Sequence, residues 1–132
     1  MIVSTKGRYA LRVLLDLASQ NTEEKTPLKE IAERQNISQK YIEAIMTLLS
    51  KNGLVDAAHG KGGGYKLNRK PSEYIVGDIL RLTEGTLSPV VCLEKGSAPC
   101  PRKNICKTLP LWTKLDELVE GYLDSVTLAD LL

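Results

Sequence analysis

The chain has 132 residues, of which 42% are hydrophobic and 26% are charged. It can therefore bury the core of one domain, and its composition excludes a disordered protein. The net charge of +2 is unevenly distributed, because residues 1–70 hold 12 Lys and Arg against 7 Asp and Glu, whereas residues 71–132 hold 6 against 9. A basic first part and an acidic second part predict that the first binds a polyanion and that the second has another task.

No apolar run approaches the roughly 18 residues that a membrane span needs, and the first residues lack the apolar region of a secretory signal. We therefore expect a cytoplasmic protein with no membrane contact, in which thiols stay reduced. The three cysteines are an odd number and lie between residues 92 and 106. That count argues against a disulfide framework and favours a metal or redox site.

The first third of the chain predicts a helix-turn-helix unit. Apolar residues at helical spacing indicate a helix over residues 6–19. Thr26 followed by Pro27 predicts a second helix, with the threonine hydroxyl as N-cap and the proline in the first turn. After a turn at 35–37, Ser38 is expected to cap a third helix that ends before Gly53. Two short helices joined by a tight turn are typical of the DNA-binding helix-turn-helix.

A β-hairpin should follow the third helix directly. Residues 54–58 and 65–67 are candidate strands, joined by a glycine-rich turn at 59–64. A hairpin in this place makes the unit a winged helix, so the expected fold is mainly α with a small β-hairpin. The glycine run does not indicate nucleotide binding, because it lacks the Gly-Lys-Ser/Thr ending and precedes a strand rather than a helix.

The second half predicts two helices separated by an irregular segment. A helix over 74–84 is expected to point Ile75, Ile79 and Leu82 inward. Residues 86–110 show no periodicity and hold all three cysteines, and a long structureless stretch is usually functional or disordered. The last helix, from about residue 111, carries an apolar stripe that no domain of its own covers: Leu111, Leu115, Leu118, Tyr122 and Val126.

This pattern predicts four parts along the chain. Residues 1–70 form the winged helix-turn-helix DNA-binding domain, and residues 71–85 form a connecting helix. Residues 86–110 form a cysteine-bearing loop, and residues 111–132 form a long C-terminal dimerisation helix with its final segment.

The first turn of the third helix should reach base edges in the major groove. It presents Ser38, Gln39, Lys40, Tyr41 and Glu43. A glutamine can pair with adenine and a glutamate can accept from cytosine, whereas Lys40 is expected at a phosphate. The alternative for Glu43 is a solvated charge, or an ion pair with Lys40 or Lys51 on the same helix.

Further DNA contacts are expected on either side of this helix. Lys6 and Arg8 lie at the start of the first helix, where the helix N-terminus also favours anions. Lys61 and His59 lie in the predicted wing, whose small basic tip fits the minor groove. His59 is the only histidine of the chain, and its alternative is a plain surface residue rather than a metal ligand.

The cysteines have the spacing C-x7-C-x5-C at Cys92, Cys100 and Cys106. Thiolates on an irregular loop can converge, and three of them hold an iron–sulfur cluster if a fourth ligand comes from elsewhere. Structural zinc is disfavoured because it uses four ligands and closely spaced cysteine pairs. The spacing alone leaves a second interpretation open, namely three free thiols or a pair that oxidises reversibly.

Several motifs together resemble the IscR-type family of bacterial winged-helix regulators, whose relatives include NsrR, RirA and CymR. They are residues 4–11 (STKGRYAL), 37–43 (ISQKYIE), 53–55 (GLV), 62–65 (GGGY), 77–80 (GDIL), 100–102 (CPR) with Cys106, and 127–131 (TLADL). The resemblance implies a homodimer with crossing C-terminal helices and binding to palindromic double-stranded DNA. In three-cysteine members it also implies a [2Fe–2S] or [4Fe–4S] cluster, here held by Cys92, Cys100 and Cys106.

The chain departs from this family pattern at three positions. IscR itself uses a histidine three residues after the last cysteine, where this chain has Leu109. Some nitric-oxide sensors of the family use an aspartate near the N-terminus, at about the place of Arg8. His59 stands where an arginine is common in the wing. The resemblance therefore implies the three cysteine ligands but supplies no fourth cluster ligand at either of the first two positions.

The leading hypothesis is a homodimeric transcriptional regulator whose operator binding is controlled by a cluster on the three cysteines. One alternative is a thiol or nitric-oxide switch without a stable cluster. Another is a regulator controlled by a partner enzyme that docks on the acidic part, as in CymR-like members. An enzyme is not expected, because the lone histidine on a hairpin offers no pair of base and nucleophile.

Overall fold

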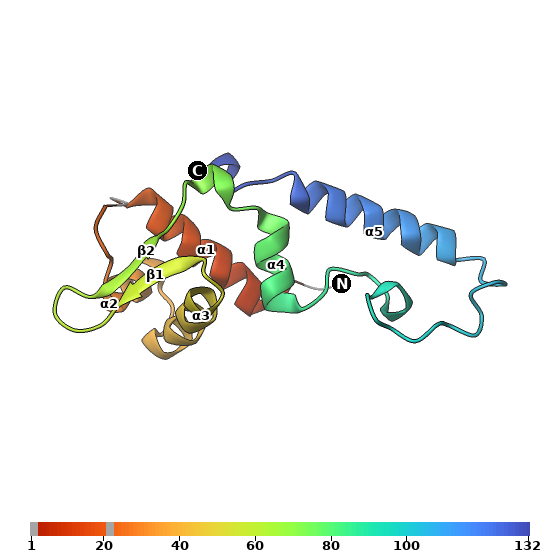
Figure 1. The fold of residues 1–132 in the computed structure, drawn as a ribbon, viewed down its shortest axis with the longest axis horizontal. Coiled ribbons are helices and arrows are strands. Elements are labelled where there is room, and N and C mark those ends of the chain that lie inside the picture. Colours follow the sequence, from red (N-terminus) through yellow and green to blue (C-terminus); the bar gives the residue numbers. More distant parts are fainter. Residues whose placement is uncertain (1–2, 21–22) are drawn as a thin grey trace.

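The computed structural model describes residues 3–20 and 23–132 and shows an elongated molecule with a winged-helix body at one end (Figure 1). The helices are α1 (Thr5–Ser19), α2 (Leu28–Gln35), α3 (Gln39–Lys51), α4 (Val76–Glu84) and α5 (Leu109–Asp124). Strands β1 (Val55–Ala58) and β2 (Gly64–Leu67) form an antiparallel hairpin. Single 3₁₀ turns η1, η2 and η3 span Pro71–Glu73, Val91–Leu93 and Ala129–Leu131. The expected fold class, mainly α with a small hairpin, is confirmed.

The ends of α3 follow the residues that the sequence singled out. The Ser38 hydroxyl accepts a hydrogen bond from the Tyr41 backbone N–H at 3.2 Å, as expected of an N-cap. Gly53 has φ of +72°, a conformation that glycine adopts without strain. The Leu54 N–H then donates to the Leu49 carbonyl at 2.9 Å, which closes the C-terminal turn of the helix.

The start of α2 differs from the prediction. The N-cap is Pro27, without a capping side chain, so Thr26 is not the cap. Instead the Thr26 backbone exchanges two hydrogen bonds with Tyr65 of β2, at 2.8 and 2.9 Å. Tertiary pairing with the hairpin therefore outcompetes the local cap. This pairing also requires a glycine at position 64, the residue before Tyr65, because a side chain there would collide with the Thr26 carbonyl.

The inward face of α4 is also shifted from the prediction. Ile75 precedes the helix in extended backbone and is 36% exposed, so it does not lie on the buried face. Its main chain forms a bridge with Thr127, and the Leu128 N–H donates to the Tyr74 carbonyl at 3.0 Å. Leu82 packs only half-buried against the core. The buried apolar residues of α4 are Val76, Ile79 and Leu80.

The main core lies inside the winged-helix body. It gathers buried aliphatic side chains from α1, α2, α3 and both strands, and it extends to Tyr74, Ile79 and Leu128. A smaller cluster of Val76, Leu80 and Leu87 packs against half-buried residues of α5. The division into four parts at residues 70, 85 and 110 stays a prediction.

Tyr74 ties the base of the hairpin to the segment that leads into α4. Its hydroxyl donates to the Leu54 carbonyl at 2.6 Å and accepts from the Asn68 N–H at 3.2 Å. Burial raises the pKa of this hydroxyl, so the group stays a neutral donor. The Arg69 guanidinium lies 5.0 Å from the ring centroid. The hairpin is thereby fixed relative to α4.

An ion pair with a buried carboxylate and a partly exposed guanidinium joins the first two helices. Asp16 is 6% exposed, and its Oδ1 lies 2.7 Å from Nη2 of Arg34 on α2. Its Oδ2 accepts from Arg34 Nε at 3.0 Å and from Gln35 Nε2 at 2.9 Å. The hydrogen bonds to Asp16 raise the pKa of the Arg34 guanidinium. Because the buried carboxylate is fully partnered, α1 and α2 hold one relative orientation.

The long helix α5 runs away from the body, and the cysteine-bearing loop lies at its far end (Figure 1). Arg81 on α4 joins the two helices, because its Nη1 and Nη2 lie 2.8 and 2.9 Å from the two carboxylate oxygens of Asp124. These hydrogen bonds lower the pKa of Asp124 below its usual 3.8. None of the residues of α5 is buried in the single chain.

The Asp124 pair predicts a pH-dependent contribution to stability. Because the folded-state pKa lies below the unfolded value of 3.8, the stabilisation is complete above that pH and is lost as the pH falls through the lowered pKa. Asp124→Asn should reduce the free energy of unfolding at pH 7 by less than about 1 kcal/mol, the range for exposed pairs. Chemical denaturation should give the same free energy of unfolding for both proteins below the lowered pKa of Asp124, where this carboxyl is protonated.

Asp78→Asn is the control, since Asp78 also contacts Arg81, at 3.3 Å, but its side chain is 69% exposed. It should have the smaller effect at pH 7. A difference between Asp124→Asn and the wild type that grows on acidification would contradict the assignment.

Candidate nucleic-acid interface and cysteine pocket

The N-terminal turn of α3 presents its predicted contacts to solvent. Gln39, Lys40 and Glu43 are all exposed, on the helix that follows the tight turn. The Ser38 oxygen accepts the capping hydrogen bond, so its hydroxyl proton and one lone pair are left for a ligand. The first turn of α3 thus brings the predicted base-reading residues to one surface.

Glu43 makes neither of the ion pairs that the sequence offered as alternatives. Among the described residues, no ion pair includes Glu43, Lys40 or Lys51. The main chain is regular here, and the Thr47 hydroxyl donates to the Glu43 carbonyl at 2.8 Å. An unpaired carboxylate on this face is what a cytosine amino group would bind.

Tyr41 has a structural contact that the sequence did not predict. Its ring is 37% exposed and meets the Tyr9 ring of α1 edge-on, with centroids 5.5 Å apart. The Arg12 guanidinium lies 5.0 Å from the Tyr9 centroid on the same helix. This edge-on contact holds α3 against α1, so part of the Tyr41 ring packs between the two helices rather than facing a ligand.

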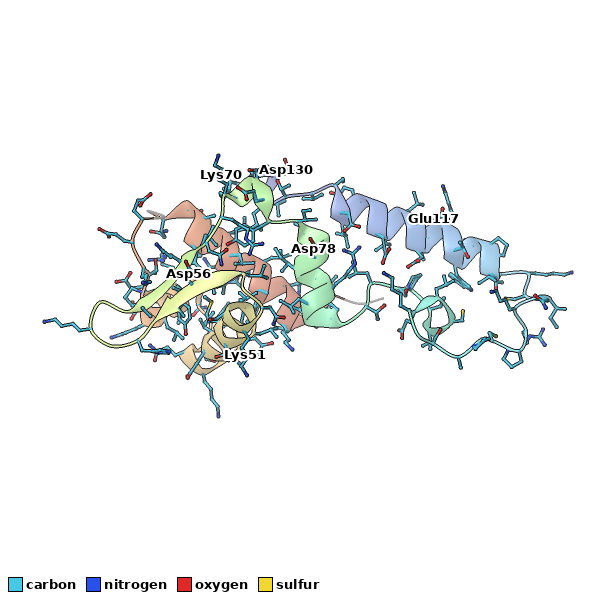
Figure 2. The ribbon with its side chains drawn as sticks, in the orientation of Figure 1. Lys51, Asp56, Lys70, Asp78, Glu117 and Asp130 are labelled. Carbon is cyan, nitrogen blue, oxygen red and sulfur yellow. The ribbon has the colours of Figure 1, made fainter. Side chains whose placement is uncertain are left out.

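Lys6 lies beside α3, across a shallow cleft of about 380 Å³ that Tyr41 and Lys51 also line. Lys51, at the far end of α3 (Figure 2), is a basic residue of this surface that the sequence did not single out as a contact. The signal was its position eleven residues after Lys40, which is close to three helical turns. Arg8 is exposed and its guanidinium donates to the Thr5 hydroxyl at 3.1 Å.

The predicted wing residues lie on the loop of the hairpin. The strands pair from Val55 with Leu67 to Ala58 with Gly64, which leaves residues 59–63 as the loop. His59 and Lys61 are both exposed there. Figure 1 places this loop at the edge of the body, at the opposite end of the molecule from the cysteine-bearing loop.

The three cysteines come together on one pocket. Cys92 lies in η2, whereas Cys100 and Cys106 lie in the turns before α5, yet all three line a single cavity of about 420 Å³. All three thiols are free. Within residues 3–20 and 23–132, no three metal-binding side chains are close enough to share an ion, so these cysteines could hold a metal only if their thiols moved closer together.

The surroundings of Cys106 lower the pKa of its thiol. The Thr108 hydroxyl, 3.4 Å from the sulfur, lowers its pKa by hydrogen bonding, and the Thr108 backbone N–H adds to this. A thiolate is the form that both metal binding and redox chemistry require. The loop therefore favours either use of its cysteines.

The other walls of the pocket include one further side chain with a metal-binding group. Leu109, at the place of the IscR histidine, lines the cavity but cannot bind a metal. Glu94 is the carboxylate among the lining residues. The sequence analysis did not consider it, although an acidic residue two positions after Cys92 was a signal that could have pointed to it.

The chain matches the Rrf2 family model, described as iron-dependent transcriptional regulators, over residues 3–132. It is 39% identical over its whole length to the transcriptional regulator IscR of Serratia proteamaculans and covers 79% of that protein. It is 40% identical over 131 residues to the transcriptional regulator CymR of Bacillus subtilis, covering 99% of this chain and 89% of CymR.

Solved structures agree with these matches. CymR, the global cysteine regulator of B. subtilis, superposes with a TM-score of 0.79 at 38% identity, covering 99% of this chain and 95% of CymR. IscR of T. potens superposes with a TM-score of 0.75 at 38% identity, covering 99% of this chain and 85% of that IscR chain. The oxidized form of Staphylococcus aureus CymR superposes with a TM-score of 0.74 at 34% identity, covering 99% of this chain and 95% of that CymR chain. Among the described residues, no helix is long and apolar enough to cross a membrane.

Glu43→Ala should relax sequence preference at one symmetric pair of operator positions, by about 1–3 kcal/mol per lost base contact. Nonspecific binding should stay equal or become stronger, because a negative charge facing DNA is removed. Binding-site selection on wild type and variant measures the preference, and identical sequence logos would contradict base recognition by Glu43.

Lys61→Ala is the contrasting variant. It should weaken binding to all sequences and reduce the log–log salt slope by about 0.9, since one phosphate contact is lost. An unchanged slope would place the wing off the DNA.

Proposed function

Because this chain belongs to the Rrf2 family of transcriptional regulators, we propose that it binds operator DNA as a homodimer under the control of an iron–sulfur cluster. The relatives named above are regulators of transcription, and this chain is likewise no enzyme. Regulators of this kind work on the bacterial chromosome, so we place the protein in the cytoplasm.

The proposed interface reads a palindromic site with both winged helices of the dimer. Base contacts come from the start of α3, and phosphate or minor-groove contacts come from α1 and the wing. The residues proposed to bind DNA are Lys6, Arg8, Ser38, Gln39, Lys40, Tyr41, Glu43, His59 and Lys61. The basic charge of residues 1–70 supports this assignment.

The observation that carries the cluster proposal is the single pocket lined by Cys92, Cys100 and Cys106. Its donor set fits, because thiolate ligands select iron–sulfur clusters. When bound, a cluster supplies a charge and a redox state that respond to oxygen, nitric oxide or iron supply. The role of the chain is to hold three thiols on a loop that begins at the end of α4 and leads into α5.

A path from this loop to the DNA face runs through Glu84. This residue ends α4, just before the loop, and its Oε1 accepts from the Ser4 hydroxyl at 2.7 Å and from the Ser4 N–H at 3.1 Å. Ser4 is the N-cap of α1, which carries Lys6 and Arg8. A change in the loop can therefore shift α1, provided that the loop orders differently in the two states.

The dimer proposal rests on the exposed stripe of α5. Its four large residues Leu111, Leu115, Leu118 and Tyr122 are 59, 38, 58 and 68% exposed. The contacts of α5 with Arg81 use Glu120 and Asp124, which lie on the opposite side of the helix. The apolar face of α5 is uncovered, whereas the opposite face contacts α4 of the same chain. This arrangement favours packing of the apolar face against a second copy.

A thiol switch without a cluster is the second candidate. The lowered pKa of Cys106 and the exposure of Cys92 and Cys100 favour it. The similarity to a CymR that has been solved in an oxidized form supports it as well. Control by a docked partner enzyme has no such observation in its favour.

Leu115→Asp combined with Leu118→Asp should convert the dimer into a monomer, because each carboxylate would be buried unpaired in the interface. Sedimentation at micromolar concentration measures the change. Glu117→Lys alters an exposed charge on the same helix and should leave the dimer intact. A double variant that stays dimeric would show that another surface forms the interface.

Anaerobic reconstitution with iron and sulfide should give a brown protein with visible charge-transfer bands and bound iron and sulfide. Cys100→Ser should show neither the visible bands nor the bound iron and sulfide, because one of the three thiolates is gone. A wild-type protein that stays colourless and free of iron would contradict the cluster and favour the thiol switch. Alkylation of the apo protein should then modify all three cysteines, because all three thiols are free.

A further inference from the structure

We propose that the Glu94 carboxylate is the fourth protein ligand of the group held by the three cysteines. This inference rests on the proposed function, because it concerns the same pocket. The site would then consist of three thiolates and one carboxylate, all from the segment between α4 and α5.

Glu94 lies on the wall of the cavity that all three cysteines line. It follows the η2 turn directly, and its N–H donates to the Val91 carbonyl at 3.0 Å. The Ser97 N–H donates to the Glu94 carbonyl at 3.2 Å, and the Ser97 hydroxyl donates to the Cys92 carbonyl at 3.5 Å. Cys92 and Glu94 therefore belong to one folded turn, so they move together when the loop closes.

The Glu94 carboxylate is available for a ligand. It is half-buried and takes part in no hydrogen bond or ion pair of the described residues, although Lys103 lines the same cavity. Other acidic groups are placed differently: Glu84 accepts from Ser4, and Asp124 pairs with Arg81. Asp116 has a buried Oδ1 without a partner, but it lines an adjoining cavity with Glu94 rather than the cysteine pocket. A half-buried carboxylate without a partner, on a residue that lines the same cavity as the three cysteines, has lone pairs free to bind a metal ion.

The remaining polar groups of the cavity are poorer ligands. An ammonium such as that of Lys103 has no lone pair to give. The Ser97 hydroxyl is turned toward the Cys92 carbonyl, and Thr113 offers a neutral hydroxyl. His59, the only histidine in the sequence, lies on the wing at the other end of the molecule. Glu94 is thus the anionic oxygen donor of this pocket.

A carboxylate in this position has a consequence for the iron that it binds. Oxygen is a harder donor than sulfur, and carboxylates favour harder metal ions than thiolates do. One iron of the cluster would therefore differ from the others in its electronic environment and would hold its ligand less tightly. That difference is measurable without any DNA-binding assay.

The test compares four full-length proteins reconstituted anaerobically with ⁵⁷Fe and sulfide: wild type, Glu94→Gln, Glu94→Cys and Glu117→Gln. The amide of Glu94→Gln keeps the shape but removes the charge, whereas Glu94→Cys supplies a fourth thiolate. Glu117 (Figure 2) is exposed on α5 and does not line the cavity, so Glu117→Gln is the matched control. The readouts are iron and sulfide per chain, the rate of iron loss to a chelator, and the Mössbauer spectrum.

The wild type should show a subset of iron with a larger isomer shift, as expected for an oxygen ligand. Glu94→Gln should lose that signal and release iron at least about tenfold faster, since even outer-shell changes cost that much metal affinity. Glu94→Cys should lose the signal but retain iron, and Glu117→Gln should match the wild type. Unchanged melting temperatures of the apo proteins exclude a folding defect as the cause.

Two results would overturn the assignment while leaving the proposed function in place. In one, Glu94→Gln retains iron as the wild type does. In the other, it releases iron faster but keeps the distinct Mössbauer signal, which gives Glu94 a structural role only. A wild type that assembles no cluster would instead overturn both the proposed function and the assignment.

Discussion

The contact between Glu84 and the start of α1 is the constraint on which the rest of the arrangement depends. The carboxylate at the end of α4 binds both the hydroxyl and the N–H of Ser4, which itself caps α1. Gly7 leaves room for this carboxylate, since a Cβ at position 7 would occupy the place of the Glu84 oxygen and would displace it from Ser4. One carboxylate thus fixes the helix that carries Lys6 and Arg8, and it does so immediately before the cysteine-bearing loop begins.

The attachment of α5 to the body is light by comparison. It consists of a small cluster around Val76, Leu80 and Leu87, exposed ion pairs to Arg81, and the pairing of the returning C-terminal segment with Ile75. Exposed ion pairs contribute little to stability. A helix that is anchored mainly at its C-terminal end, with an uncovered apolar stripe, is suited to be completed by a second chain.

The two places where the sequence misled share a physical cause. Thr26 has the right chemistry for an N-cap and Ile75 has the right spacing for an inward position, but in both cases the backbone pairs with a segment far away in the chain. Thr26 binds Tyr65 across the hairpin, and Ile75 pairs with Thr127. Such pairing satisfies backbone donors and acceptors more completely than a local cap does, and no local pattern reveals it.

The sequence by itself determined the helices, the hairpin, the Ser38 cap and the glycine end of α3, because hydrophobic period and cap chemistry act over a few residues. It also indicated an unpartnered stripe on α5, since an uncovered apolar face is visible in the spacing alone. Only the tertiary structure decided that Lys6 and Lys51 flank one cleft and that Glu94 shares a pocket with Cys100 and Cys106 as well as with nearby Cys92. Those proximities join residues across irregular segments or separate helices, where chain geometry has no period from which a meeting point could be deduced.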